Sequence, residues 1–302
     1  MKEKLKNFSF TSHFKIFALI SALFVSVGIV GLILTACGVQ NVFNFDIDFI
    51  GGTTMSFDLH QSVDKNTTDD VEALFREVTG TKPSSVITSG EQSVTVKSLE
   101  LNDQQRLDVV DAMTEKYGLS NGDYQIDYVS ASVSGDLARS AVIASVLAVV
   151  LILIYIAIRF EFKSGIAAIC ALVHDLLAML SMYIIFRIPF NINFIAAALT
   201  ILGYSINATI VVFDRVRENK RLDASAPFAQ IVDTSIWQTM TRSLNTTITT
   251  LLVMVVLLIL GVSSIKNFAL PLCIGVVCGC YSSVCISGPV WNLLASKKHA
   301  KA

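Results

Sequence analysis

Six long apolar runs constrain this chain more than any other feature of its sequence. A membrane-spanning helix needs roughly 20 predominantly apolar residues, and each run is near or above that length. The runs are Phe14 to Ala36, Leu137 to Ile158, Gly165 to Ile185, Phe194 to Phe213, Ser243 to Leu260 and Phe268 to Leu294. Together with a composition that is 53% hydrophobic over 302 residues, they predict an integral membrane protein with six transmembrane helices.

Charge is distributed unevenly and predicts the orientation of the chain. Residues 38–136 hold 17 acidic and 6 basic side chains, whereas the rest of the chain holds 7 acidic and 17 basic ones. Basic residues gather at both ends and in alternate connections: Lys2, Lys4, Lys6, Arg159, Lys163, Arg215, Arg217, Lys220, Arg221, Lys297, Lys298 and Lys301. By the positive-inside rule, both termini are cytoplasmic. The predicted domains are a cytoplasmic amino terminus (1–13), a first span (14–36), an extracytoplasmic domain (37–136), five further spans (137–294) with a cytoplasmic loop at 214–242, and a cytoplasmic tail (295–302).

Alternating and helical periodicities predict one α+β domain within residues 37–136. A strand at 55–59, a helix at 68–78, a hairpin at 85–97, a helix at 107–117 and a strand at 124–128 follow one another. Thr68 or Asp69 can cap the first helix, and Leu107, Val110, Met113 and Tyr117 form the apolar stripe of the second. The order βαββαβ is that of a ferredoxin-like split βαβ fold.

This domain contains no pattern typical of catalysis. Its one histidine, His60, lies at the edge, and it has no cysteine and no grouped nucleophile and base. We therefore expect a binding or lever domain and no enzyme activity. Gly51 and Gly52, near its start, allow a tight turn or a close approach of two backbone segments.

The third apolar run contains the pair His174-Asp175, about ten residues from its cytoplasmic start and so near the bilayer centre. An ionisable residue at that depth is costly and is by default a functional-site hypothesis. An acid beside a histidine can carry protons. The structural alternative is a neutral Asp175 that hydrogen-bonds a neighbouring helix for packing alone.

Polar residues also follow one face of the fourth run and one face of the fifth. They are Thr200, Tyr204 and Asn207 in the fourth run, and Arg242, Thr246 and Thr249, with Asn245 beside them, in the fifth. Spacings of four and three place each set on one side of a helix. Such faces turn toward other helices or a wet cavity, so the two faces could meet. The alternative for Arg242 is a snorkelling anchor at the inner interface.

Three further segments have local patterns that predict how they fold or pack. Pro227 can start a helix whose apolar stripe lies on the inner membrane surface; the stripe is Phe228, Ile231, Val232 and Ile236. Leu34 to Cys37 resembles a lipoprotein cleavage box, but the run before it is longer than a signal-peptide core, so we expect no cleavage. The cysteines between Cys273 and Cys285 flank Gly275 and Gly279, a small-xxx-small pair that favours helix packing over a metal site.

Five motifs in order resemble the SecF branch of the SecD/SecF protein-export family, within the resistance-nodulation-division (RND) superfamily. They are FDIDFIGGT, VSGDL, ALVHD, GYSINATIVVFDRVREN and SIWQTMTRSLNTTITTLL, and the resemblance covers nearly the whole chain. It implies a six-helix RND-type half with one exported α+β domain. It also assigns structural or coupling roles to Asp48, Gly51, Gly52, Asp214, Arg215, Arg217, Glu218 and Asn219.

The resemblance further implies an accessory, non-enzymatic role in protein export at the bacterial inner membrane. The expected partners are SecD, which adds another six spans, the SecYEG channel, secreted polypeptide chains and membrane lipid, with no nucleic acid. The proton-motive force is expected to help draw secreted chains outward, and no cofactor is expected. Two alternatives remain, namely an RND-type half that transports small molecules and a scaffold of the channel assembly that uses no ion gradient.

One position departs from the family pattern. The residue after Asn207 is commonly Asp, taken as a proton carrier that works with the arginine found here at Arg242, but this chain has Ala208. Either Asp175 substitutes, or SecD supplies the acid, or protons do not drive this protein. The expected coupling ion is H+, with Na+ as the alternative because Ser205, Asn207 and Thr246 offer oxygens that hard cations accept. The predicted ion pathway comprises His174, Asp175, Tyr204, Asn207, Arg242 and Thr246.

Overall fold

The computed structural model describes residues 8–39, 42–99, 101–261 and 263–296. It divides into a helical unit, formed by residues up to Asn44 and from Ile143 onward, and an α+β unit, Phe45–Val142. The terminal lysines that carried part of the orientation argument lie outside the described residues: Lys2, Lys4, Lys6, Lys297, Lys298 and Lys301.

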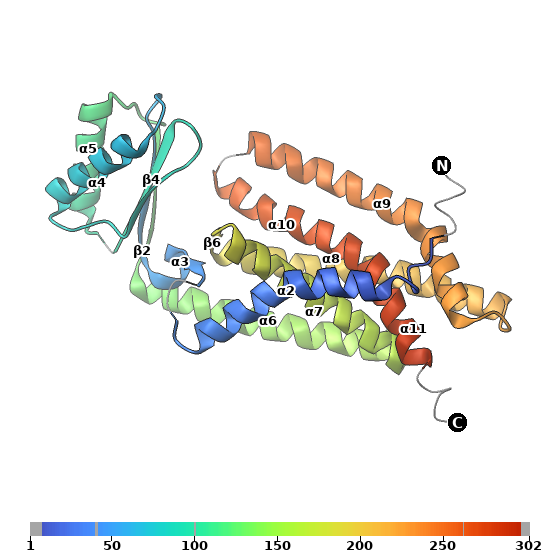
Figure 1. The fold of residues 1–302 in the computed structure, drawn as a ribbon. Coiled ribbons are helices and arrows are strands. Elements are labelled where there is room, and N and C mark those ends of the chain that lie inside the picture. Colours follow the sequence, from blue (N-terminus) through green and yellow to red (C-terminus); the bar gives the residue numbers. More distant parts are fainter. Residues whose placement is uncertain (1–7, 40–41, 100, 262, 297–302) are drawn as a thin grey trace. The chain divides into compact units, whose positions relative to one another are not determined.

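Six helical segments of the described chain are long and apolar enough to cross a membrane (Figure 1). They are α2 (Phe14–Ala36), α6 (Ala131–Arg159), α7 (Phe162–Ile185), α8 (Ile192–Leu222), α9 (Phe228–Leu260) and a last segment made of α10 (Ser263–Ser282), the π-helical turn η1 (Ser283–Ser287) and α11 (Gly288–Ser296). Two short strands, β1 (Asn44–Phe45) and β6 (Pro189–Phe190), lie between helices. All six predicted spans fall within these segments, which confirms the helical membrane bundle.

The connection between the fourth and fifth spans is shorter than the sequence suggested. The helix α8 continues to Leu222 and α9 begins at Phe228, so that only residues 223–227 separate them. Most of the segment 214–242 is therefore helical. Asp223 accepts hydrogen bonds from the hydroxyl and backbone N–H of Ser225, which hold the pKa of its carboxyl below the usual value.

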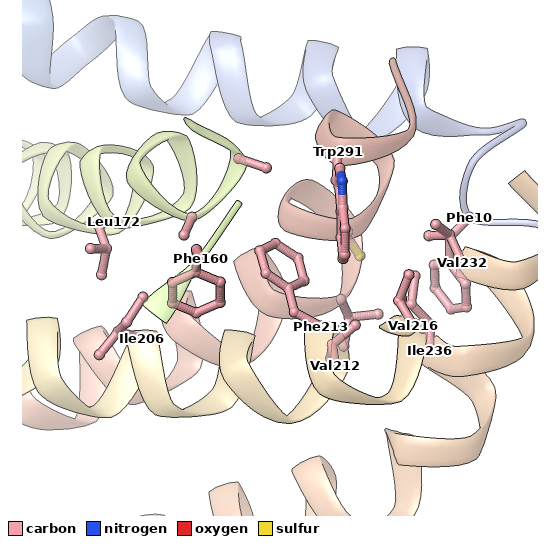
Figure 2. Packing of buried hydrophobic residues seen from close by; sticks show 14 of the residues in the cluster. Phe10, Phe160, Leu172, Ile206, Val212, Phe213, Val216, Val232, Ile236 and Trp291 are labelled. Carbon is pink, nitrogen blue, oxygen red and sulfur yellow. The ribbon is translucent and has the colours of Figure 1, made fainter. Parts of the chain in front are cut away.

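The apolar stripe at the start of α9 packs inward, and the prediction that it lies on the membrane surface is wrong. Val232 and Ile236 are fully buried in the larger core of the helical unit. A short connection folds α9 back along α8. Val232 and Ile236 therefore lie in the same core as Val216 of α8 and Trp291 of α11 (Figure 2). Burial of each such side chain contributes about 1.5–3 kcal/mol, more than a half-exposed position on the membrane surface offers.

Glycines on α10 allow this helix to approach α8 closely. A Cβ atom on Gly275 would overlap the Ile201 side chain, and one on Gly279 would lie 3.4 Å from Cβ of Ser205. The small-xxx-small prediction for this pair is therefore confirmed. The close approach matters because Ser205 and the end of α10 face a buried acid.

The segment of residues 8–13, called the strap below, attaches the amino-terminal end of the helical unit to α9 by hydrogen bonds. Ser9 Oγ and Thr11 Oγ1 donate to Oδ2 of Asp233 at 2.5 and 2.8 Å, and the Thr11 backbone N–H donates to Oδ1 at 2.9 Å. Phe10, between them, is buried in the same core. Three hydrogen bonds to one carboxylate and a buried ring fix this strap on the first third of α9.

The α+β unit contains every element that the periodicities predicted. They are β2 (Gly52–Asp58), α4 (Lys65–Thr79), β3 (Ser85–Thr88), β4 (Ser93–Ser98), α5 (Asp103–Tyr117) and β5 (Tyr124–Val129), preceded by the short helix α3 (Ile47–Ile50). The strands form one antiparallel sheet in the order β3-β4-β2-β5. Met55 of β2 lies opposite Val96 and Ile126, and its side chain is buried in the core that α4 and α5 share with the sheet.

Two details of the helices in this unit differ from the predictions. The helix α4 begins before Thr68, and Asp64 caps it by accepting the Thr67 N–H at 2.8 Å in a capping box. These hydrogen bonds hold the pKa of the Asp64 carboxyl below its usual value. In α5, Leu107 is exposed and Val109 is buried in the core. The buried face of α5 is therefore rotated about the helix axis relative to the predicted stripe.

The glycine pair at the start of β2 is required by the backbone. Gly51 and Gly52 have φ angles of 71° and 132°, a region that side chains with a Cβ rarely adopt. A Cβ on Gly52 would also overlap the carbonyl oxygen of Ser98 on the neighbouring strand. The prediction of a tight turn or close backbone approach is confirmed in both respects.

Gly52→Ala is expected to destabilise the α+β unit by about 2 kcal/mol or more, since it combines backbone strain with a steric overlap. Gly90→Ala is the matched control, because Gly90 also has positive φ, 84°, but nothing lies within 4 Å of an added Cβ. Limited proteolysis of the full chain during heating would follow cleavage between residues 52 and 129. Equal shifts for the two variants would contradict the close approach at Ser98.

Candidate functional site

Asp175 lies near the middle of α7 and is almost completely buried, with 1% of its surface exposed. Ser205 Oγ from α8 and Ser282 Oγ from α10 both donate to its Oδ2 atom, at 2.5 and 2.8 Å. His174 Nδ1 lies 3.0 Å from its Oδ1 atom. The carboxyl group therefore joins three membrane-spanning segments in a single hydrogen-bonded cluster.

The surroundings of Asp175 satisfy a group that would otherwise be costly to bury. Ser205 and Ser282 are fully buried, and each supplies a hydroxyl proton to an oxygen that has left water. Gly279 lies beside the carboxyl group, where an added Cβ would be at ordinary contact distance, 3.7 Å from Asp175 Oδ2. The cluster lies where α8 and α10 approach each other closely, an approach that Gly275 permits.

His174 extends the cluster toward α2. Its ring lies 5.7 Å from the ring of Tyr281, centroid to centroid. The Tyr281 hydroxyl donates to the carbonyl oxygen of Phe17 at 3.0 Å and accepts from Ser21 Oγ at 3.2 Å. The His174 side chain, 11% exposed, also lines an apolar groove of about 480 Å³ between α2, α7 and α10. A change in the charge of the His174-Asp175 pair would therefore alter contacts in four membrane-spanning segments, those that contain α2, α7, α8 and α10.

The remaining residues of the predicted pathway surround a separate cavity of about 150 Å³ between α8, α9 and α10. Its lining includes Tyr204, Asn207, Ala208, Arg242, Thr246 and Thr247. Tyr204 Oη and Thr247 Oγ1 lie 3.2 Å apart, and Thr246 Oγ1 donates to the Arg242 carbonyl at 2.9 Å. The polar faces of the fourth and fifth spans therefore meet in part at this cavity, whereas Thr200, Asn245 and Thr249 lie outside it and are exposed.

Asp175 and Arg242 are not paired. Within the described part of the chain, no ion pair or hydrogen bond joins them, and the side chain of Arg242, an exposed residue, forms no ion pair with a described residue. Ser205 belongs to the Asp175 cluster, whereas Asn207 and Thr246 line the cavity. The three oxygens considered for Na+ are thus divided between two places. Among the described residues, no group of His, Cys, Asp or Glu suits a metal ion.

Residues of the DRVREN motif fasten the end of α8 to the helices beside it. Asp214 accepts from Arg159 Nη2 of α6 at 2.7 and 2.8 Å. Arg215 Nε donates to Gln238 Oε1 of α9 at 2.5 Å, and Asn219 Nδ2 donates to the same oxygen at 2.8 Å. These contacts place Asp214, Arg215 and Asn219 at the junction of α6, α8 and α9.

The other two charged residues of this motif support the same junction. Arg217 lies over the ring of Phe160, 5.4 Å from its centroid, and pairs with Asp214 at 3.7 Å. Glu218 accepts from Arg215 Nη1 at 2.7 Å. In the α+β unit, Asp48 lies in the first turn of α3, next to the glycine pair.

Sequence reasoning missed Ser282 and Tyr281 as partners of the His174-Asp175 pair. The segment GCYSSVCIS carried a signal, because three hydroxyl groups occur together there inside an otherwise apolar run. Hydroxyl groups at membrane depth find partners on neighbouring helices. Which acid they serve depends on helix packing and could not be read from spacing.

Sequence comparisons find related proteins over most of this chain. The family model described as "Protein export membrane protein SecD/SecF, C-terminal" matches residues 109–297. Protein translocase subunit SecF of Acidaminococcus fermentans is 37% identical, over 97% of this chain and 99% of that protein. Protein translocase subunit SecDF of Bacillus subtilis is 39% identical, over 95% of this chain but only 38% of that longer protein.

Solved structures give the same result for the fold. The crystal structure of SecDF from Thermus thermophilus, a translocon-associated membrane protein, matches with a TM-score of 0.81 at 33% identity, over 96% of this chain and 39% of that one. A crystal structure of SecDF in a super-membrane-facing form matches with a TM-score of 0.63 at 29% identity, over 97% and 39%.

Fold and site together define a multi-pass helical membrane protein that carries a polar, hydrogen-bonded interior and one α+β unit. The chain belongs to the SecD/SecF family of protein-export membrane proteins. It is accordingly an accessory translocase subunit of Sec protein export in bacteria and not an enzyme, and the family prediction is confirmed.

Ser282→Ala is expected to destabilise the helical unit by about 1–3 kcal/mol, because it removes a donor from a buried carboxylate. The same substitution made in an Asp175→Leu background should cost much less, since no carboxylate is then left unsatisfied. Thermal unfolding of the detergent-solubilised full chain would measure both effects in a double-mutant cycle. Additive effects would show that the hydrogen bond contributes nothing to stability.

Proposed function

We propose that this chain is a SecF-type subunit that works with a SecD-type partner, and that ion movement past Asp175 drives late steps of export through SecYEG. The observation that carries the proposal is the burial of Asp175 at mid-helix, where serines of two other helices hold it. An ionisable group at this depth is expensive to keep. Its retention is best explained by a change of charge during the working cycle.

Protonation of Asp175 would alter the packing of three helices. Ser205 and Ser282 both donate to the same carboxylate oxygen. A proton on that oxygen turns it into a donor, so that the two serines can no longer bind it in the same way. Packed helices respond to such changes by shifting between discrete arrangements. His174 Nδ1, 3.0 Å away, is suited to pass the proton.

The membrane potential is large enough to bias such a change. Moving one elementary charge across 100 mV yields ~2.3 kcal/mol, which shifts a two-state equilibrium about 50-fold. The α+β unit would respond through α6, which begins within that unit and continues as the second span. We place this unit outside the cytoplasm on the positive-inside distribution of the basic residues. Its strand order, β3-β4-β2-β5, supports a ferredoxin-like fold.

An exposed polar face of the helical unit supports a SecD-type partner. Asn207 on α8 and Arg242, Asn245 and Thr249 on α9 are all exposed. Polar groups facing lipid at this depth would cost several kcal/mol when unpaired. We propose that membrane-spanning helices of the partner cover this face. The relatives named SecDF, of which this chain spans 38% or less, carry long additional segments in one polypeptide.

Ala208 leaves three routes open for coupling. Asp175 can be the titrating acid, the partner can supply one near Arg242, or a different ion can be used. The hydrogen-bonded environment of Asp175 favours the first route. Na+ remains the alternative to H+, although an arginine among the cavity residues opposes cation binding there.

Asp175→Asn is expected to abolish the stimulation of export by an imposed proton gradient while leaving gradient-independent export intact. The amide cannot change its charge, yet it keeps a polar group of the same size between the serines. The measurement is export of a secreted reporter in membrane vesicles that contain the SecD-type partner. Asp111→Asn, an exposed carboxylate of α5, serves as the control.

Other outcomes of this export assay separate the remaining routes. Full proton stimulation in Asp175→Asn would move the titrating site to the partner, and Ala208→Asp would test whether an acid beside Arg242 restores coupling. Stimulation by sodium but not by protons would contradict proton coupling. Normal export and normal assembly in both Asp175→Asn and Arg242→Ala would leave a scaffold role.

Asn245→Trp is expected to reduce recovery of the SecD-type partner several-fold when the tagged chain is purified in mild detergent. A large ring on the exposed polar face of α9 would obstruct helix packing across that face. Val146→Trp, on the exposed apolar side of α6, is the matched control and should leave recovery unchanged. Equal recovery with both variants would place the partner on another face.

A further inference from the structure

We propose that the apolar groove between α2, α7 and α10 binds one acyl chain of a membrane phospholipid. The groove measures about 480 Å³, which lies within the ~300–1,000 Å³ of common ligand sites. The inference uses only the membrane location of these three segments and is independent of proton coupling at Asp175. It identifies a lipid contact built into the helical unit, in addition to the proposed protein partner.

The side chains around the groove offer apolar contacts from all three segments. They are Ile20 and Phe24 of α2, Ala178 and Met182 of α7, and Ile274 and Val277 of α10. In hydrocarbon, apolar groups gain from close van der Waals contact rather than from leaving water, and a void beside them forfeits those contacts. A slender hydrocarbon chain makes such contacts with three walls at once, which it cannot do on an open helix surface.

The polar side chains of the lining already have partners within the protein. Ser21 Oγ donates to Tyr281 Oη at 3.2 Å, and that hydroxyl donates to the carbonyl oxygen of Phe17 at 3.0 Å. His174 Nδ1 lies 3.0 Å from Asp175 Oδ1. Two thiols complete the set, and thiols are weak hydrogen-bond donors. A ligand with polar groups of its own would leave them unpaired at this depth, which is unfavourable in hydrocarbon, so the groove favours an apolar ligand.

The groove is continuous with the exposed apolar surface of the same segments. Leu19 and Leu23 of α2, Val173 of α7 and Val277 of α10 are all exposed. The helices that carry them are long and apolar enough to cross a membrane, and exposed apolar side chains of such helices face the acyl chains of lipid. The mouth of the groove therefore opens into the hydrocarbon of the bilayer, which supplies the proposed ligand directly.

The groove opens on a different side of α10 from the polar cavity near Arg242. Cys278 lines the groove, whereas Cys280 lines the cavity. Positions two apart on an α-helix are about 200° apart around its axis. Among the described residues that line the groove, none is both polar and exposed, unlike the face of α8 and α9 assigned to the partner. Lipid, rather than a partner helix, is the occupant that this chemistry favours.

The length and direction of the groove match an acyl chain of one leaflet. The groove extends along α7 from His174 to Met182 and along α10 from Tyr281 to Cys273. At 1.5 Å per residue, each stretch is about 12 Å long, close to the ~15 Å that is half of the hydrocarbon core of a bilayer. The rings of His174 and Tyr281 lie 5.7 Å apart, centroid to centroid, so the groove begins at the same level on both helices.

The test measures lipid labelling of the purified full chain in an uncharged steroid detergent, whose rigid body competes poorly for a narrow groove. A phosphatidylcholine with a photoreactive diazirine near the end of one acyl chain is added in increasing amounts, and mass spectrometry locates the adducts after irradiation. We expect labelling of residues 273–281 to saturate at about one probe per chain, while labelling of the exposed apolar side of α6 rises in proportion to the probe. Proportional labelling at both places would overturn the proposal.

Two tryptophan variants locate the site. Val277→Trp places a large ring in the groove from its exposed side and should reduce the saturable labelling several-fold. Leu147→Trp, at an exposed apolar position of α6, is the matched control and should label as the wild type does. Lipid should raise the Tm of the wild type and of Leu147→Trp but not that of Val277→Trp, because a ligand that binds only the folded state stabilises it. The Tm without lipid checks that both variants fold, and unchanged labelling in Val277→Trp would overturn the proposal.

Competition and partner experiments separate the acyl chain from other occupants. Unlabelled phosphatidylcholine, phosphatidylethanolamine and phosphatidylglycerol should compete equally, because they share the acyl chain. Competition by phosphatidylglycerol alone would assign the site to an anionic headgroup and overturn the proposal. Labelling should persist when the SecD-type partner is present, and its loss would place a partner helix in the groove and overturn the proposal. Asp175→Asn should also retain saturable labelling, so that a failure of proton coupling in the export assay leaves this inference intact.

Discussion

The burial of the Asp175 carboxylate is the constraint on which the helical unit is arranged. A carboxylate in hydrocarbon needs donors, and those donors come from two other helices, through Ser205 and Ser282. The close contact of α8 and α10 brings these serines to the acid, and Gly275 permits it, since a Cβ there would overlap the Ile201 side chain. At Gly279, beside the acid, an added Cβ would make ordinary contacts, 3.4 Å from Cβ of Ser205 and 3.7 Å from Asp175 Oδ2. Helix packing and the chemistry of the site are therefore a single requirement.

The helices α8 and α10 each present two adjacent faces, one to Asp175 and one to the cavity. Gly279 and Ser282 of α10 lie toward the acid, while Cys280 of α10 and Ser283, the first residue of η1, line the cavity. The π-helical turn η1 begins at Ser283, and such turns are frequent where a helix serves a functional site. Because the two places share these walls, a shift of either helix in response to Asp175 would change the shape of the cavity.

The sequence predicted the elements well and their long-range partners poorly. Apolar runs located all six membrane helices, and alternation located every strand of the α+β unit, since both signals are local. Asp175 was recognised from its cost at membrane depth, but Ser282 was missed because its role depends on how α10 packs. The start of α9 at Pro227 was predicted correctly, but the environment of its apolar stripe was not, for the same reason. Its apolar stripe suits a membrane surface and a protein core equally, and only the short connection after Leu222 decides between them.

Ala208 stands where the family pattern commonly has Asp. The separation of Asp175 from Arg242 limits how Asp175 could take over the role of that missing acid. The acid accepts hydrogen bonds from two serines, whereas Arg242 lines a separate cavity and forms no ion pair with a described residue. The two side chains therefore form no direct ion pair in this structure. If Asp175 carries the proton, its effect must reach Arg242 through movement of α8 and α10, whose side chains line both places. Protonation of Asp175 would then act on Arg242 through a movement of helices. An acid paired directly with Arg242 would act on it through a change in electrostatic attraction.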